Sequence, residues 1–187
     1  MENKDESIYI KRILNGETNL FSYFPERYSR SIYSLIIRII PIKEDAEELT
    51  QDTFIKAFRK LDTFKADCSF STWLYRIAYN TAVSATRKKK IVVPAFDEYT
   101  LENIPDDAVD SMLDKEDDEA MLLRLESAIE QLNLEDKTLI TLYYMEEKSI
   151  SELASVLGLT SENVKVKLYR ARKKLFVLIN SKENDRR

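Results

Sequence analysis

The side chains with the clearest potential for chemistry lie in the stretch FSTWLYRIAYN, around Trp73, the only tryptophan of the chain. On a helical wheel of about 100° per residue, residues 70–88 separate into an apolar arc and a polar arc. The apolar arc consists of Leu74, Ile77, Ala78, Thr81 and Ala85. The polar arc consists of Trp73, Arg76, Asn80, Ser84 and Arg87. An aromatic ring beside amide and guanidinium donors, followed by the bases of residues 87–90, is typical of surfaces that hold unstacked nucleic-acid bases. The alternative is that Trp73 folds back onto the preceding loop and fills the core of its own module.

A second motif, SISELASVLGLTSENVKVKLYRARKKL, has the form of a helix-turn-helix. Ser149 and Glu152 form a capping box that opens a helix, Gly158 supplies the tight turn, and Thr160 or Ser161 caps the next helix. The second helix has an apolar stripe at spacings of three and four: Val164, Leu168, Ala171, Leu175 and Leu178. The rest of its surface carries six bases able to contact phosphates: Lys165, Lys167, Arg170, Arg172, Lys173 and Lys174. The alternative is a helical hairpin whose basic face meets only water.

The composition leaves little room for catalysis. The chain has no His, one Cys and two Gly, which argues against imidazole catalysis, His/Cys zinc sites, disulfides and glycine-rich phosphate loops. Carboxylate or lysine catalysis remains compatible with the composition, but no such groups form a recognisable constellation. We therefore expect no enzyme activity, no metal and no cofactor, and we interpret Cys68 as a spectator thiol.

The charge divides the chain of 187 residues into three segments. Residues 91–119 carry eleven acids and one base, a net charge of −10, whereas the whole chain carries −4. With Pro94 and Pro105 and no sustained apolar period, this stretch is predicted to be an acidic flexible linker. Its simplest role is that of a solvated spacer that aids solubility. The predicted domains are residues 1–90 and 120–187, with residues 91–119 as the linker.

The periodicity of the flanking segments is helical, and no sustained alternating strand pattern is present. We expect helices over 8–14, from about 21 to just before Pro41, and over 44–61 and 71–89, with Pro25 kinking or dividing the second. The interior face predicted for 44–61 consists of Ala46, Leu49, Thr53, Ala57, Phe58 and Leu61. The fold class is therefore all-α, two small helical domains of which the second contains the helix-turn-helix. No membrane insertion and no export are expected, because no apolar run is long enough and the N-terminus lacks a leader pattern, so a cytoplasmic protein is predicted.

Two segments carry a resemblance to a known family. The stretch EDAEELTQDTFIKAFRKLDTFKADCSFSTWLYRIAYNTA and the later VKVKLYRARKKL resemble the extracytoplasmic-function (ECF) alternative sigma factors of bacterial RNA polymerase, over about 18–90 and 120–178. The resemblance implies that the first domain binds core polymerase and melts the −10 promoter element. It implies that the second domain recognises the −35 element, and that the linker passes through the RNA path of the enzyme.

Carried over position by position, the resemblance assigns three groups of residues. Glu48, Gln51 and Asp52 would contact the coiled coil of the largest polymerase subunit. The −10 element would be held by Lys65, Asp67, Ser69, Phe70, Trp73, Arg76, Asn80, Arg87 and Lys88. The −35 element would be contacted by Ser161, Asn163, Lys165, Val166, Lys167, Tyr169, Arg170, Arg172, Lys173 and Lys174. Of these, Lys165, Val166, Tyr169 and Arg170 would face base edges, and Lys167, Arg172, Lys173 and Lys174 would face phosphates. The family often has Asp, Thr and Arg where this chain has Ser84, Asn163 and Lys167.

The implied partners are core RNA polymerase and promoter DNA, both as duplex and as melted strand, and an anti-sigma factor is a further candidate. Two promoter elements about two helical turns apart are separated by roughly 70 Å, and 29 linker residues can extend to about 95 Å. One chain can therefore reach both elements. The rival hypothesis is a stand-alone helix-turn-helix regulator with an N-terminal dimerisation or signalling module, which a test of binding to core polymerase would separate from the first. An enzyme acting on nucleic acid is the third hypothesis.

Overall fold

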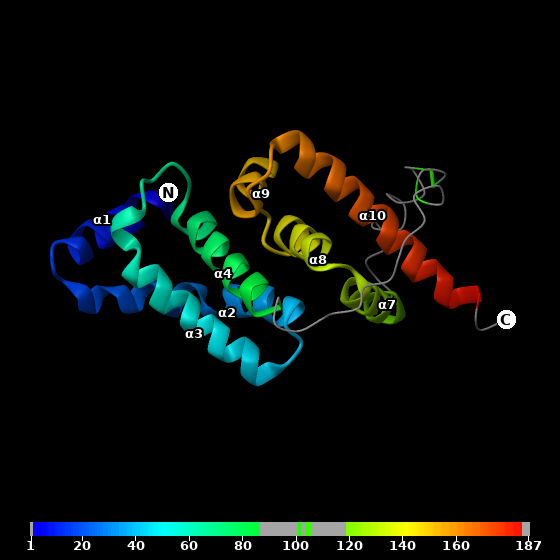
Figure 1. The fold of residues 1–187 in the computed structure, drawn as a ribbon, viewed down its shortest axis with the longest axis horizontal. Helices are drawn as coiled ribbons and strands as arrows, with labels where there is room; N and C mark the ends of the chain where they lie inside the picture. Colours follow the sequence, from blue (N-terminus) through cyan, green and yellow to red (C-terminus); the bar gives the residue numbers. More distant parts are fainter. Residues whose placement is uncertain (1, 87–100, 102–103, 106–118, 185–187) are drawn as a thin grey trace.

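The computed structural model describes residues 2–86, 101, 104–105 and 119–184, and every regular element within them is helical. The all-α prediction is confirmed. The elements fall into an N-terminal group ending at residue 86 and a C-terminal group starting at residue 119 (Figure 1). Apart from Leu101, residues 104–105 and Glu119, the predicted linker lies outside the described residues, as do Arg87 and Lys88. In the described part, no helix is long and apolar enough to cross a membrane.

The first domain packs four helices and two short 3₁₀ turns around an apolar and aromatic core. Its elements are α1 (Glu2–Leu14), η1 (Thr18–Ser22), α2 (Tyr23–Ile39), α3 (Lys43–Arg59), η2 (Leu61–Thr63) and α4 (Phe70–Thr86). Phe24 of α2 and Phe70 at the start of α4 are buried with ring centroids 4.0 Å apart. This aromatic pair fixes the start of α4 against α2, and it therefore positions the loop that precedes α4.

The second predicted helix is divided before Pro25 and not at this residue. The 3₁₀ turn η1 ends at Ser22, and α2 starts at Tyr23, so that Pro25 lies in the first helical turn. A missing backbone N–H costs nothing there, because the first N–H groups of a helix have no intrahelical partner. The prediction that Phe58 faces inward was wrong: its ring is exposed and packs edge-on against Phe21, and Phe54 is buried instead.

The second domain contains the predicted helix-turn-helix. Its elements are α7 (Glu119–Gln131), α8 (Leu134–Ile140), the π-helical turn η3 (Thr141–Met145), α9 (Ile150–Leu157) and α10 (Ser161–Asn184). The capping box of Ser149 and Glu152 starts α9, and Gly158 ends it in the left-handed conformation at φ 69°. The cap of α10 is Thr160, whose Oγ1 accepts a hydrogen bond from the backbone N–H of Asn163 at 3.2 Å. The predicted apolar stripe of α10 is buried along its whole length.

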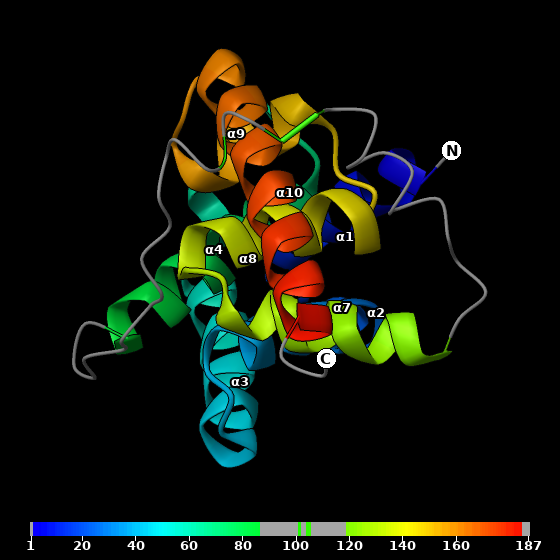
Figure 2. The same cartoon turned by 90° about the vertical axis from the view of Figure 1, so that its right-hand side faces the viewer.

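The two domains are in contact with each other. Helix α9 packs against α4, and α8 packs against α2. Seen from the side of the second domain, α10 crosses α7 and α8 (Figure 2). The helix that carries Trp73 and the first helix of the helix-turn-helix therefore lie side by side.

Candidate nucleic-acid and polymerase surfaces

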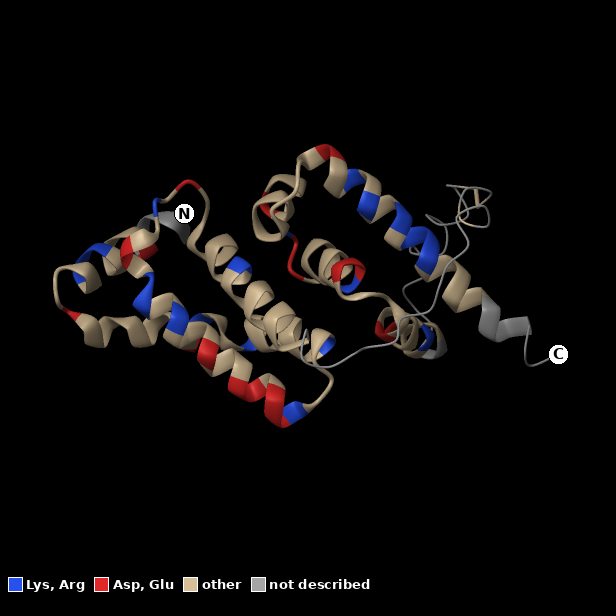
Figure 3. Cartoon of the chain, viewed as in Figure 1, with Lys and Arg blue, Asp and Glu red and all other residues tan. Residues whose placement is uncertain are grey.

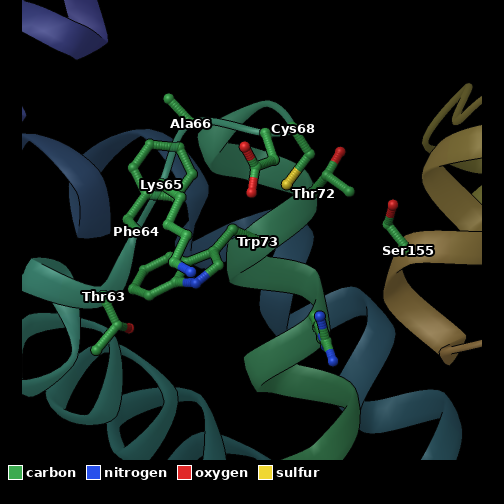
Figure 4. A pocket seen from close by; sticks show the side chains of 10 residues that line it. Thr63, Phe64, Lys65, Ala66, Cys68, Thr72, Trp73 and Ser155 are labelled. Carbon is green, nitrogen blue, oxygen red and sulfur yellow. The ribbon is translucent and has the colours of Figure 1, made fainter.

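A cavity of about 260 Å³ lies beside Trp73. Its wall is formed by Trp73, Arg76 and Thr72 of α4, by the segment 63–68 and by Ser155 of α9 (Figure 4). The segment makes a tight reversal, because Ala66 has a positive φ of 58°. The cavity is large enough to accept part of a nucleotide, and both an aromatic ring and a guanidinium line it.

Trp73 is half-buried: its indole packs on the preceding loop and also lines the cavity, and its contact with bases stays a prediction. Its ring centroid lies 5.4 Å from that of Phe64 and 5.6 Å from that of Phe70, so the indole packs on the preceding loop and the edge of the core. The same side chain lines the cavity. Arg76 and Asn80 are exposed on α4, one and two turns after Trp73. The indole is therefore held in place by its neighbours without being sealed from solvent.

The other residues predicted at the −10 site fall into three environments. Lys65 and Asp67 line the cavity. Ser69 caps α4, because its Oγ accepts the backbone N–H of Thr72 at 3.2 Å. Phe70 is buried in the core, where it supports the Trp73 ring. Their contacts with DNA stay predictions, as do those of Arg87 and Lys88.

Cys68 also lines the cavity. Burial raises the pKa of its thiol, and the neighbouring carboxylate of Asp67 raises it further. The thiol is therefore protonated at neutral pH and a poor nucleophile, in agreement with the interpretation as a spectator. Among the described residues, no group of His, Cys, Asp and Glu side chains has the arrangement of a metal site.

The three residues predicted to meet polymerase lie on α3. Glu48 and Gln51 are exposed, whereas Asp52 is half-buried with its carboxylate 3.9 Å from the Lys56 ammonium. The N-terminal half of α3 carries most of the acidic side chains of this helix (Figure 3). Ile55 follows Gln51 by one turn and is 47% exposed. Sequence reasoning missed this residue, although an isoleucine outside the predicted inward set of α3 was a visible signal.

The described bases of α10 lie between Lys165 and Lys174, in the part of the helix nearer its N-terminus (Figure 3). The four residues predicted to face base edges, Lys165, Val166, Tyr169 and Arg170, are all exposed, as is Asn163. Ser161 is half-buried at the first turn. The four base-edge residues form one continuous face of α10, because residues three and four apart are neighbours on a helix.

The bases predicted to face phosphates are engaged within the protein. The Lys167 ammonium lies 2.9 Å from the Glu135 carboxylate of α8. Lys173 is only 4% exposed, and its ammonium lies 4.4 Å from the centroid of the Tyr169 ring. Lys174 pairs with Asp136, and Arg172 is half-buried. The phosphate contacts of these four residues stay predictions.

The comparisons with known proteins follow the same division of the chain. Residues 25–91 match Sigma-70 region 2, and residues 122–175 match Sigma-70, region 4. Together with the helical fold, these matches define a sigma subunit of RNA polymerase. The chain belongs to the ECF RNA polymerase sigma factors. It is 32% identical over 183 residues to the ECF RNA polymerase sigma factor SigW of Bacillus subtilis (strain 168), covering 89% of this chain and 92% of that protein.

Solved structures share the fold of this chain. The chain is similar to CnrH, solved in complex with the cytosolic domain of CnrY, with a TM-score of 0.68 and 25% identity over 93% of this chain and 96% of that one. Its fold is also that of the sigma factor RpoE from Bartonella quintana, solved with the anti-sigma factor NepR, with a TM-score of 0.62 and 22% identity over 86% and 96% of the two chains. The protein therefore directs promoter recognition and transcription initiation by RNA polymerase. Its partners are core polymerase and promoter DNA, and it is not an enzyme.

Proposed function

We propose that the first domain binds core polymerase and captures the opened −10 element, while the second domain recognises the −35 duplex. The observation that carries this division is the cavity beside Trp73, with Arg76 and Asn80 exposed along the same helix. Stacking of a base on an aromatic side chain contributes about 1 to 3 kcal/mol, which is enough to bias a locally opened duplex toward the melted state. The chemistry of RNA synthesis belongs to the polymerase.

At the −35 element, the exposed face of α10 makes the base contacts. The guanidinium of Arg170 suits bidentate hydrogen bonds to guanine, and Val166 suits a contact with a thymine methyl group. Tyr169 lies between them on the same face and carries a phenol that can donate or accept a hydrogen bond. Lys165 contributes a phosphate or base contact at the N-terminal part of the helix, which is the part that helix-turn-helix proteins place in the major groove.

The polymerase surface consists of Glu48, Gln51 and Asp52 with Ile55 as its apolar centre. Binding energy at protein interfaces is concentrated in a few residues surrounded by polar ones, and an exposed isoleucine beside acidic and amide groups has that arrangement. The acidic linker of residues 91–119 connects this surface to the −35 domain through the enzyme.

We place the protein in the cytoplasm, where its polymerase acts. A regulatory partner of the anti-sigma class is also part of the proposal, since the RpoE structure carries such a factor.

Two experiments test the proposed function. The chain should co-purify with core polymerase and direct transcription in vitro from a subset of genomic fragments, with start sites sharing two conserved elements. A chain that binds duplex promoter DNA by itself and fails to associate with core polymerase would instead be a stand-alone regulator.

A further inference from the structure

Helix α1 carries a buried carboxylate that lies outside both proposed DNA surfaces. Glu6 is only 4% exposed, and it precedes residues 25–91, the part of the chain that matches Sigma-70 region 2. Its Oε1 atom accepts a hydrogen bond from the Tyr28 hydroxyl and lies 3.6 Å from Nε of Arg27, both on α2. A buried charge is costly unless it is paired and hydrogen-bonded, so these two contacts fix the position of α1 on α2.

The phenol of Tyr28 is suited to hold this carboxylate. Burial raises the pKa of Tyr28, and the hydrogen bond to Glu6 raises it further, so the hydroxyl is protonated at neutral pH and donates. The guanidinium carbon of Arg27 lies over the Tyr28 ring, 5.6 Å from its centroid. The Tyr28 ring is thus held at its hydroxyl by Glu6 and on its face by Arg27.

A second contact joins the same two helices. The rings of Tyr9 on α1 and Tyr23 on α2 are stacked, with centroids 4.3 Å apart and an angle of 10° between their planes. Nη1 of Arg27 donates a hydrogen bond to the Tyr23 hydroxyl at 3.4 Å. We call these five residues the α1 brace: Glu6 and Tyr9 on α1, and Tyr23, Arg27 and Tyr28 on α2.

Aromatic rings in contact lead from the α1 brace to Trp73. The centroid of the Tyr28 ring lies 6.2 Å from that of Phe70. The Tyr23 ring lies 5.4 Å from Phe24, and Phe24 lies 4.0 Å from Phe70. Phe70 in turn lies 5.6 Å from Trp73. Both contacts of α1 therefore converge on Phe70, the ring that supports the indole.

Helix α1 also contacts η2, the 3₁₀ turn that leads into the segment 63–68. This segment forms part of the wall of the cavity beside Trp73, and its Phe64 ring lies 5.4 Å from the indole. Helix α1 thus supports two parts of the cavity, the indole and the neighbouring loop.

We propose that the α1 brace positions the Trp73 indole for stacking on an unstacked −10 base. This inference rests on the proposed function of Trp73. Protein interiors are close-packed, so a change in the rings behind Phe70 is transmitted to the indole that packs on it. Glu6 acts through Tyr28 and Phe70 and is therefore a positioning residue.

The α1 brace should serve promoter opening and not the other functions of the chain. The N-terminal half of α3, which carries Glu48 and Gln51, lies at the other end of the first domain from α1 (Figure 1). The exposed bases of α10 belong to the second domain. A defect confined to opening therefore distinguishes a displaced indole from a general loss of structure.

The test replaces Glu6 in the full chain and assembles each variant with core polymerase. Glu6→Leu removes the acceptor of the Tyr28 hydroxyl, whereas Glu6→Gln retains an amide oxygen in its place. The matched control is Glu17→Leu, the same change in a carboxylate that pairs with Arg12 of α1 at the protein surface. Tyr28→Phe removes the hydroxyl, keeps the ring, and serves if Glu6→Leu folds poorly.

Promoter opening is measured by permanganate footprints under conditions in which circular dichroism shows every variant to be folded. Glu6→Leu should lower the ratio of open to closed complexes about fivefold, less than removal of the indole, because a displaced ring still stacks in part. Glu6→Gln and Glu17→Leu should stay within about twofold of wild type. Glu6→Leu/Tyr28→Phe should be no more impaired than either single variant, because the two residues act as one unit.

The fluorescence of Trp73 reports the position of the indole, because it is the only tryptophan of the chain. In the free chain, acrylamide quenching of Trp73 should rise in Glu6→Leu and stay at the wild-type level in Glu6→Gln and Glu17→Leu. The affinity for core polymerase and the −35 preference of the holoenzyme should be the same in all these variants.

Opening at the wild-type level by Glu6→Leu would overturn the proposal, as would a loss of core polymerase affinity as large as the loss of opening. Normal opening by Trp73→Ala would instead overturn the proposed function of the indole. In that case, Trp73 quenching in the free Glu6→Leu chain would still decide whether α1 positions the indole.

Discussion

The Lys174 ammonium on α10 lies 2.5 Å from the Asp136 carboxylate on α8, and the two side chains are only 17% and 7% exposed. Asp136 also accepts a hydrogen bond from Asn133 Nδ2 at 2.7 Å, and the Asn133 side chain in turn caps α8. Helix α10, which we propose to face DNA, is thus tied to the start of α8 by a largely buried ion pair. In the free chain, Lys174 acts as a structural residue of the second domain.

The first prediction concerns this ion pair. Lys174→Met should lower the free energy of unfolding by about 2 kcal/mol, because Asp136 is left as a largely buried carboxylate without its cation. Urea denaturation of the full chain measures the change. Lys165→Met is the control, since Lys165 is exposed on the same helix and its loss should change stability by less than about 0.5 kcal/mol. Equal stability of the two variants would contradict the structural role of Lys174.

The second prediction separates base recognition from phosphate binding on α10. Arg170→Ala should relax the preference for the −35 sequence, at a cost of about 1 to 3 kcal/mol on the best promoter, if its guanidinium contacts a guanine. Binding of the holoenzyme to promoters that differ only at −35 measures this preference. A uniform loss across all sequences would place Arg170 on the phosphate backbone instead.

The third prediction concerns promoter opening. Trp73→Ala should reduce the ratio of open to closed promoter complexes about 5- to 150-fold, which corresponds to the loss of one stacked base, and should affect closed-complex binding less. Permanganate footprints of the −10 region measure opening. Trp73→Tyr is the matched control, because it retains an aromatic ring at the position that packs against Phe64 and Phe70. Footprints of equal strength for Trp73→Ala and wild type would remove the indole from the mechanism.

The helix-turn-helix could be predicted from sequence because its signals are local. Ser149 and Glu152 specify a helix start over three residues, and Gly158 adopts the positive φ that the turn requires. The apolar stripe from Val164 to Leu178 follows the helical period, so its burial needs no knowledge of the partner helices. The positions of the exposed residues on α10 follow from the same helical period.

The contacts that the sequence could not reveal are those between segments distant along the chain. A lysine on a helix surface is predicted to be solvated, but Lys173 is buried against Tyr169, and Lys167 pairs with Glu135 of α8. Glu152 was predicted only as a cap, because the capping box accounts for one of its oxygens and nothing local specifies the partner of the other. Phe58 follows the inward period of α3, yet its ring packs at the edge of the domain against Phe21. Tertiary packing decides each of these cases.

The fourth prediction tests the polymerase surface. Ile55→Ala should weaken the binding of core polymerase about tenfold, because truncation of an apolar side chain at the centre of an interface removes contacts that become buried on binding. Competition for core polymerase against a labelled sigma factor measures the affinity. The stability of the free chain should change little, since the side chain is 47% exposed. Unchanged affinity would exclude this face of α3 from the apolar part of the interface.

The last prediction concerns how the stability of the folded chain changes as the pH falls below neutrality. Burial raises the pKa of the Glu152 carboxyl, but hydrogen bonds from Ser149 and Thr72 and the charge of Lys148 outweigh it, so the pKa lies below its ordinary value of 4.5. Between the lowered pKa and 4.5, the unfolded chain binds more protons at this site than the folded chain. The stabilisation is therefore complete above 4.5 and disappears as the pH falls through the lowered value. Wild type should exceed Glu152→Gln in urea midpoint at about pH 6, and the difference should shrink steadily toward about pH 3. A difference that stays constant or grows on acidification would show that the carboxylate form of Glu152 does not stabilise the folded chain.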